Sequence, residues 1–166
     1  SSDVCSSDLW PEALPNFIAV HPWSRGEGKS LSNSSLQALC DALAPHPVVL
    51  VGMTSDPTRP TGGHIHDWSQ RTSLPELIWI MRQAKFCISV DSGPMHIAAA
   101  VNRQTLGIHT WSDPRKVGPY PSGAQVWKGG RIAQRSEFSA EECQSDASVT
   151  DQDARGIGEW VCQRLA

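Results

Sequence analysis

The chain has 166 residues, with 14 basic and 17 acidic side chains and a formal net charge of −3. This length supports one domain with a real core, the charge offers no basic surface for nucleic acid, and no apolar run is long enough to span a membrane. The five cysteines form no CxxC pair, which indicates reduced thiols in a cytoplasmic protein rather than a disulfide framework or a zinc site.

The first 16 residues are expected to lie outside the folded domain. Residues 1–9 repeat Ser-Ser-Asp and match no packed element, which indicates a non-native leader, and residues 10–16 carry two prolines, as a linker does. We therefore expect the domain to occupy residues 17–166 and the natural protein to extend upstream.

Short apolar runs and helical apolar spacing alternate along the rest of the chain. Strands are predicted at Phe17–His21, Val48–Val51, Phe86–Val90, Thr105–His109 and Gln125–Trp127. Helices are predicted behind Ser32 or Asn33, behind the capping box formed by Ser73 and Glu76, from Pro94 to Val101, and behind Thr150. Irregular, turn-rich segments are predicted over residues 52–63, 111–123 and 129–148. This alternation predicts an α/β fold, a Rossmann-like parallel sheet with helices on both faces.

The segment Phe86–Ala100 carries the clearest functional signal. Its strand ends in the turn Asp91-Ser92-Gly93, and a helix begins directly behind the turn. The free N–H groups and the positive dipole end of that helix favour an anion. Asp91, Ser92 and His96 converge at a strand's carboxyl end, where ligands bind in open α/β sheets. At Gly93 a Cβ would intrude on the anion site, with added strain if φ were positive. The alternative is an ordinary turn that binds nothing.

Two alternating histidines, His64 and His66, stand with Asp67 near the end of a Gly-rich loop. They suggest a metal site, but no third ligand follows at a set spacing. We therefore predict no metal.

Three blocks of sequence resemble one known family, the family 9 glycosyltransferases or lipopolysaccharide heptosyltransferases. The resemblance runs from Phe17 to Tyr120 and covers about two thirds of the chain. The blocks are His21-Pro-x-Ser-Arg-x-x-x-Lys29, Thr72-Ser-Leu-x-Glu-Leu77 leading to Asp91-Ser-Gly-Pro-Met-His-Ile-Ala-Ala-Ala100, and Ser112-Asp-Pro114 with Gly118-Pro-Tyr120. The middle block is the specific one, whereas the segment 129–148 hardly matches.

The resemblance implies a GT-B enzyme, in which two Rossmann-type domains face each other across a cleft. The C-terminal domain binds a nucleotide-sugar donor, typically ADP-heptose, without a metal or other cofactor. The N-terminal domain holds the lipid-linked saccharide acceptor and the catalytic carboxylate. This chain resembles only the donor domain, so its catalytic base is expected in a half that is not present and the chain alone is expected to be inactive. The same analogy implies a location in the bacterial cytoplasm and allows peripheral attachment to the inner membrane. That no nucleic acid is a partner is expected from the net charge of −3 instead.

The resemblance also implies roles for individual residues. Lys29 matches the phosphate-binding lysine, Ser24 matches a diphosphate-binding hydroxyl residue, and Arg25 departs from the hydroxyl residue that is common at its position. The N–H groups of Ser92 and Gly93 are expected to bind phosphate or sugar, and His96 the diphosphate. Asp91 is expected to hold a sugar hydroxyl or, alternatively, to order the turn. Thr72, Ser73 and Leu74 match the loop that lines the base pocket. The alternatives are a solvated loop lysine for Lys29 and a local backbone cap for His96.

Asp56 lies in the loop behind the second predicted strand, a usual place for an acid that binds ribose hydroxyls. The alternative, which the sequence favours, is a turn-forming aspartate before Pro57.

Two other functions compete with the transferase. One is a nucleotide- or anion-binding module that folds and acts alone. The other is a hydrolase that uses Ser92, against which the chain has no Gly-x-Ser-x-Gly elbow and no evident base for Ser92.

Overall fold

The computed structural model of the chain describes residues 14–120 and 123–166. The leader and linker predicted over residues 1–16 lie outside these ranges, apart from the last three residues. Within the described residues, one sheet contains seven strands in the order β3-β2-β1-β4-β5-β6-β7. The strands are β1 Ile18–His21, β2 Val48–Leu50, β3 Ile65–Asp67, β4 Phe86–Val90, β5 Thr105–His109, β6 Gln125–Lys128 and β7 Arg131–Gln134.

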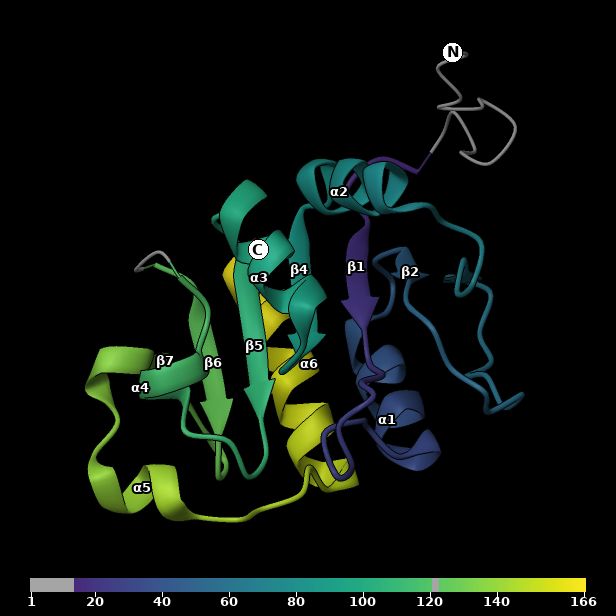
Figure 1. The fold of residues 1–166 in the computed structure, drawn as a ribbon. Helices are drawn as coiled ribbons and strands as arrows, with labels where there is room; N and C mark the ends of the chain where they lie inside the picture. Colours follow the sequence, from purple (N-terminus) through teal and green to yellow (C-terminus); the bar gives the residue numbers. More distant parts are fainter. Residues whose placement is uncertain (1–13, 121–122) are drawn as a thin grey trace.

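The strands of this sheet are parallel except for β7, which pairs with β6 in the antiparallel sense. The arrowheads of β1, β4, β5 and β6 accordingly point the same way in Figure 1. An order of 3-2-1-4-5-6 is the Rossmann order. The α/β, Rossmann-like prediction is therefore confirmed.

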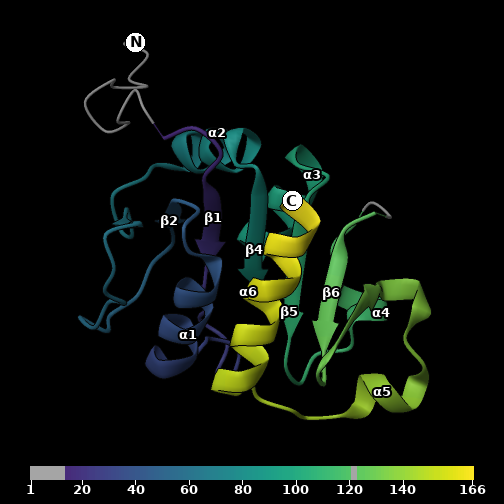
Figure 2. The same ribbon diagram turned by 180° about the vertical axis from the view of Figure 1, so that it is seen from behind.

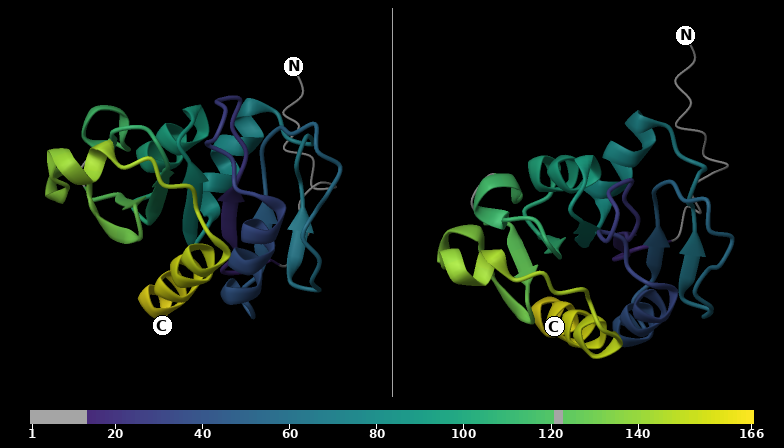
Figure 3. Two further views of the ribbon diagram at one scale, coloured as in Figure 1. Left: turned by 90° about the horizontal axis from the view of Figure 1, so that it is seen from below. Right: turned by 60° about the horizontal axis from the view of Figure 1, so that its bottom comes forward.

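Helices cover both faces of the sheet (Figure 3). α1 and α6 lie side by side on one face, which Figure 2 shows in front, and α2 and α3 lie on the other. The helices are α1 Asn33–Leu43, α2 Leu74–Gln83, α3 Gly93–Val101, α4 Pro114–Val117, α5 Ala140–Gln144 and α6 Asp151–Leu165, with a 3-10 turn, η1, at Arg135–Glu137. Ser32, Ser73 and Thr150 cap α1, α2 and α6 as predicted, each by accepting a backbone N–H.

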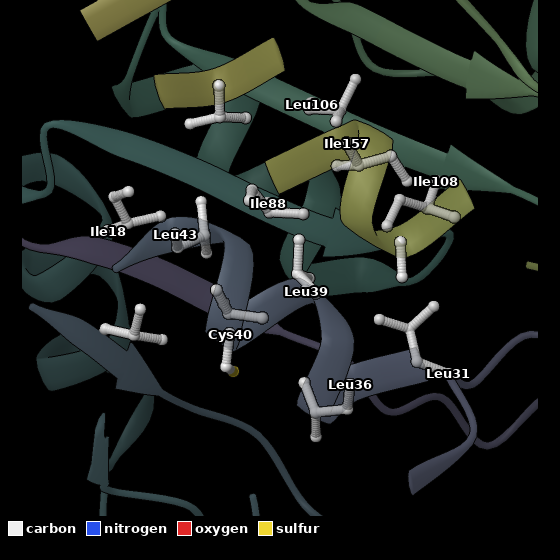
Figure 4. Packing of buried hydrophobic residues seen from close by; sticks show 14 of the residues in the cluster. Ile18, Leu31, Leu36, Leu39, Cys40, Leu43, Ile88, Leu106, Ile108 and Ile157 are labelled. Carbon is white, nitrogen blue, oxygen red and sulfur yellow. The ribbon is translucent and has the colours of Figure 1, made fainter. Parts of the chain in front are cut away.

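The core divides by strand alternation into two layers. In β1, Ile18 and Val20 face α1 and α6, whereas Ala19 faces α2 and α3. The larger layer is shown in Figure 4, where Leu39 of α1 and Ile157 of α6 meet side chains of β4 and β5. Cys40 and Cys87 are buried free thiols, and burial raises the pKa of each to about 12. Their predicted place in the core is confirmed.

Two predicted irregular segments contain regular structure. The loop predicted at 111–123 holds α4, and the segment predicted to be irregular at 129–148 holds β7, η1 and α5. Gly129 and Gly130 adopt positive φ angles of 57° and 87°, which closes a two-residue hairpin between β6 and β7. Ser139 and Glu142 then form a capping box for α5. The glycine pair and the capping box are both present in the sequence, but the polar composition of the segment led to the prediction of irregular structure. The short strand β3 was also missed.

No helix in the described part of the chain is both long enough and apolar enough to cross a bilayer.

Candidate functional site

The candidate site lies where the strand order reverses. β1 pairs with β2 on one side and β4 on the other, and the chain leaves these two central strands toward opposite faces of the sheet. From β1 it passes to α1, and from β4 it passes to α3, on the other face. A crevice therefore opens at the carboxyl ends of β1 and β4, the usual ligand site of open α/β sheets.

A cavity of about 460 Å³ occupies this position. Its lining includes seven of the residues that the sequence predicted for a site: Ser24, Arg25, Thr72, Ser73, Leu74, Ser92 and Gly93. They come from three separate segments, the loop behind β1, the start of α2 and the start of α3. The fold therefore brings the predicted base pocket and the predicted phosphate turn together.

The turn between β4 and α3 leaves the first turn of the helix open to a ligand. Ser92 is the N-cap of α3 but makes no side-chain cap hydrogen bond within the described residues. Its hydroxyl donates instead to the carbonyl oxygen of Val90 at 3.0 Å. The N-caps of α1, α2, α5 and α6, by contrast, each accept a backbone N–H through their hydroxyl groups. The N–H groups at the start of α3 thus remain free of a side-chain acceptor.

Gly93 differs from the expectation in one respect. Its φ is not positive, and among the described residues nothing outside its chain neighbours and the backbone of its own helix lies within 4 Å of the place where a Cβ would stand. A side chain at position 93 would therefore not strain the turn through φ. It would project from a residue that lines the cavity.

Lys29 and Asp91 form an ion pair beside the cavity. The Lys29 ammonium lies 2.7 Å from Oδ2 of Asp91 and 4.6 Å from the centre of the Trp111 ring. Burial alone would raise the pKa of Asp91, but hydrogen bonds from Lys29 and Ser112 outweigh it and lower the pKa. The two side chains are 19% and 7% exposed, so the ammonium is held in place yet remains partly accessible.

His21, at the end of β1, lines the cavity and was not singled out from the sequence. Its Nδ1 lies 3.2 Å from the Ser89 hydroxyl and 3.4 Å from the Ser92 hydroxyl. Both hydroxyls also lie within hydrogen-bond distance of the Val90 carbonyl oxygen, to which they can donate. Burial lowers the pKa of His21 to about 4. An imidazole with so low a pKa is a weak base for Ser92, which argues against the hydrolase.

Gly52 makes room for the His21 ring. Its φ is +117°, and a Cβ there would stand 2.6 Å from Cδ2 and 2.7 Å from Nε2 of His21. Any side chain at position 52 would therefore displace the imidazole. Gly52 and Met53, which also lines the cavity, lie directly behind β2 and could be found only once the strand order was known.

His21 predicts a pH dependence of stability. The unfolded chain takes up a proton at His21 near pH 6.5, whereas the folded chain takes it up only near pH 4. Stability from this group is therefore complete above pH 6.5 and falls as the pH drops toward 4. At pH 5 the loss should be about 2 kcal/mol in the free energy of unfolding.

Urea unfolding at pH 7.5 and pH 5 measures this loss. His21→Gln should reduce the difference between the two pH values, and the same substitution at exposed His96 should not. A parent protein and a His21→Gln variant with equal pH dependence would contradict the assignment.

Four predicted site residues are not among those that line the cavity: Lys29 and Asp91, which form the ion pair, and Asp56 and His96. Asp56 is exposed and accepts the Thr58 N–H at 2.7 Å and the Asn33 side-chain amide at 3.0 Å, which is the turn geometry that the sequence favoured. These same bonds lower the pKa of Asp56. His96 lies exposed in the first turn of α3. Its role toward a diphosphate stays a prediction.

His64 and Asp67 of the 64–67 segment have other partners. His64 Nε2 lies 2.8 Å from the Cys40 carbonyl oxygen, and Asp67 pairs with Arg59 at 3.0 Å. Within residues 14–120 and 123–166, no three His, Cys, Asp or Glu side chains are grouped so that they could hold a metal ion.

Comparisons with known proteins agree with this geometry. The family model described as glycosyltransferase family 9 (heptosyltransferase) matches residues 16–147. The chain belongs to glycosyltransferase family 9. Lipopolysaccharide heptosyltransferase 3 of Escherichia coli is 28% identical to this family 9 chain over 127 residues, which are 69% of this chain and 37% of that protein.

Solved structures show the same fold at low identity. The structure of the E. coli ADP-heptose lipopolysaccharide heptosyltransferase II matches with a TM-score of 0.72 and 21% identity, over 96% of this chain and 50% of that one. The E. coli heptosyltransferase WaaC with ADP matches with a TM-score of 0.67 and 16% identity, over 92% and 45%. The family 9 chain thus spans half or less of the length of these relatives.

Proposed function

We propose that this chain is the donor-binding half of a heptosyltransferase-like enzyme. It would bind a nucleotide-sugar of the ADP-heptose class for transfer to a lipopolysaccharide core acceptor. The acceptor site and the catalytic base would belong to a second half, without which no transfer is expected. The work of such an enzyme would take place at the cytoplasmic face of the inner membrane. One related structure was solved with ADP, which supports this class of donor.

The observation that carries the proposal is that two features adjoin at the point where the strand order of the sheet reverses. The cavity lined by Thr72, Ser73 and Leu74 adjoins the uncapped start of α3 at Ser92 and Gly93. A nucleoside in the cavity would thus have its phosphates at a helix N-terminus, where N–H groups and the helix dipole favour negative charge. The base pocket and the phosphate turn lie in contact with one continuous cavity.

Lys29 would supply the positive charge for the reaction. When the sugar is transferred, the nucleoside diphosphate leaves and negative charge develops on its terminal phosphate. We assign stabilisation of that charge to the Lys29 ammonium and the N–H groups of α3, with no resident metal or cofactor. The ion pair with Asp91 holds the ammonium in place before the ligand arrives, which lowers the entropy lost on binding.

The proposal predicts that Lys29→Ala weakens ADP binding about tenfold or more, because a charged hydrogen bond to phosphate is worth roughly 1.5–3 kcal/mol. The control is Lys85→Ala. Lys85 is also exposed to solvent, but it directly precedes β4 and so lies at the amino end of that strand, whereas the cavity lies at the carboxyl end. Calorimetric titration of the folded variants with ADP measures both affinities.

A second variant distinguishes the two effects of Lys29→Ala, which are the loss of the phosphate contact and the unpaired charge left on Asp91. Lys29→Ala with Asp91→Asn has neither charge and should still bind ADP about tenfold more weakly than the parent. Equal affinities for Lys29→Ala and Lys85→Ala would contradict the assignment of Lys29. A parent chain that binds no ADP at all would contradict the proposed function.

A further inference from the structure

The loop that carries Lys29, residues 22–32, is held from outside by the segment directly behind β5. The Thr110 hydroxyl donates to the Gly28 carbonyl oxygen at 2.9 Å, and the Trp111 indole N–H donates to the Glu27 carbonyl oxygen at 3.0 Å. Two consecutive residues thus bind two consecutive carbonyl groups immediately before Lys29. The remaining bonds of this loop include the local pairs between Ser24 and Ser30.

A buried lysine anchors the same segment from the other side. Lys128, the last residue of β6, is 2% exposed, and its ammonium donates to the carbonyl oxygens of Thr110 and Ser145. Burial lowers the pKa of Lys128. Burying an ammonium group is costly unless it is hydrogen-bonded, so both carbonyl groups are firmly held. Thr110 is therefore fixed by its carbonyl group and free to position the Gly28 carbonyl with its hydroxyl.

The held segment also contacts the Lys29 side chain itself. The centre of the Trp111 ring lies 4.6 Å from the Lys29 ammonium. Two consecutive residues, Thr110 and Trp111, thus act on the backbone before Lys29 and on its ammonium.

We propose that Thr110 and Trp111, anchored by Lys128, form a clamp that positions Lys29 for the phosphate groups of the donor. The inference rests on the proposed function, because it assumes that Lys29 binds the diphosphate. Thr110 and Trp111 are positioning residues. They act through Lys29 and need not touch the ligand.

Titration of the full 166-residue chain with ADP and with adenosine tests the clamp. Thr110→Val keeps the shape of the side chain and removes the hydroxyl donor. It should weaken ADP binding about three- to tenfold, the effect of one hydrogen bond, and leave adenosine binding unchanged because adenosine has no phosphate. Thr110→Ser retains the hydroxyl and should bind ADP as the parent does. In a chain that already carries Lys29→Ala, Thr110→Val should cause no further loss.

Thr105→Val is the matched control. Thr105 is a buried threonine at the other end of β5, and its hydroxyl donates to the Asn102 carbonyl at 2.8 Å. The Thr105→Val variant should bind ADP with the affinity of the parent. If Thr110→Val does not fold, Trp111→Phe at a half-exposed position removes the other donor, with the same expected loss.

Three results would overturn the clamp while the proposed function stands. These are parent-like ADP affinity in Thr110→Val, an equal loss for ADP and adenosine, and a full additional loss in the Lys29→Ala background. Failure of the parent to bind ADP would instead overturn the proposed function and the clamp with it.

Discussion

Gly93→Val should abolish ADP binding while the domain stays folded. Gly93 begins α3 and lines the cavity, and an added side chain would project from the cavity lining beside the free N–H groups of the first helical turn. A phosphate that loses two such hydrogen bonds should bind about a hundredfold more weakly or worse. The measurement is calorimetric titration with ADP, with folding followed by circular dichroism at the same temperature.

The stability of this variant should fall only moderately. The φ angle of residue 93 is one that valine can adopt, and apart from its chain neighbours and the backbone of α3 none of the described residues lies within 4 Å of the new Cβ. A β-branched residue before Pro94 in a helical turn is nevertheless disfavoured, at a cost of roughly 1–3 kcal/mol. Gly63→Val is the control, since Gly63 is equally open in the described structure and does not line the cavity. A folded Gly93→Val variant that binds ADP as the parent does would remove the α3 turn from the site.

Gly158→Val should destabilise the fold by about 2–3 kcal/mol, the cost of overpacking a close helix contact. A Cβ at Gly158 of α6 would stand 2.6 Å from the Cβ of Ala42 and 3.1 Å from the carbonyl oxygen of Leu39, both on α1. The two helices would have to separate, which opens the core layer shown in Figure 4. Urea unfolding at neutral pH measures the change in the free energy of unfolding.

Gly156→Val, two residues earlier on α6, is the matched control. Apart from its chain neighbours and the backbone of α6, no described residue lies within 4 Å of its Cβ position, and the gain in helix propensity over glycine should make the change neutral or slightly favourable. Equal destabilisation by the two valines would show that the effect comes from valine in this helix. It would then have nothing to do with the approach of α6 to α1.

The local elements could be predicted from the sequence because they depend on neighbouring residues. Short apolar runs predicted β4 at Phe86–Val90 and β5 at Thr105–His109, and hydroxyl residues predicted the N-caps Ser32, Ser73 and Thr150. Each signal is a side-chain pattern that determines the backbone conformation within a few residues. The same rules could have found the hairpin at Gly129 and the start of α5, which lie in a polar segment beside a small cluster of buried residues.

The candidate site was only partly predictable. The motif residues Ser24, Thr72 and Ser92 were found from their sequence blocks, and the structure brings all three to one cavity. The ion pair of Lys29 with Asp91, which are 62 residues apart, could not be predicted, because no local pattern joins them. Asp56 stands behind a strand as a ribose-binding acid would, yet it lies outside the cavity lining.

The sequence by itself thus determined five of the seven described strands, the starts of the longer helices and the residues of the predicted phosphate turn. The tertiary structure alone decided which of them meet. Placing β4 beside β1 joins the turn at Ser92 to the loop of Lys29, and placing β6 beside β5 sets the ammonium of Lys128 beneath Thr110. The reason is physical: periodicity and capping depend on residues a few positions apart, whereas strand order follows from burying both faces of the whole sheet at once.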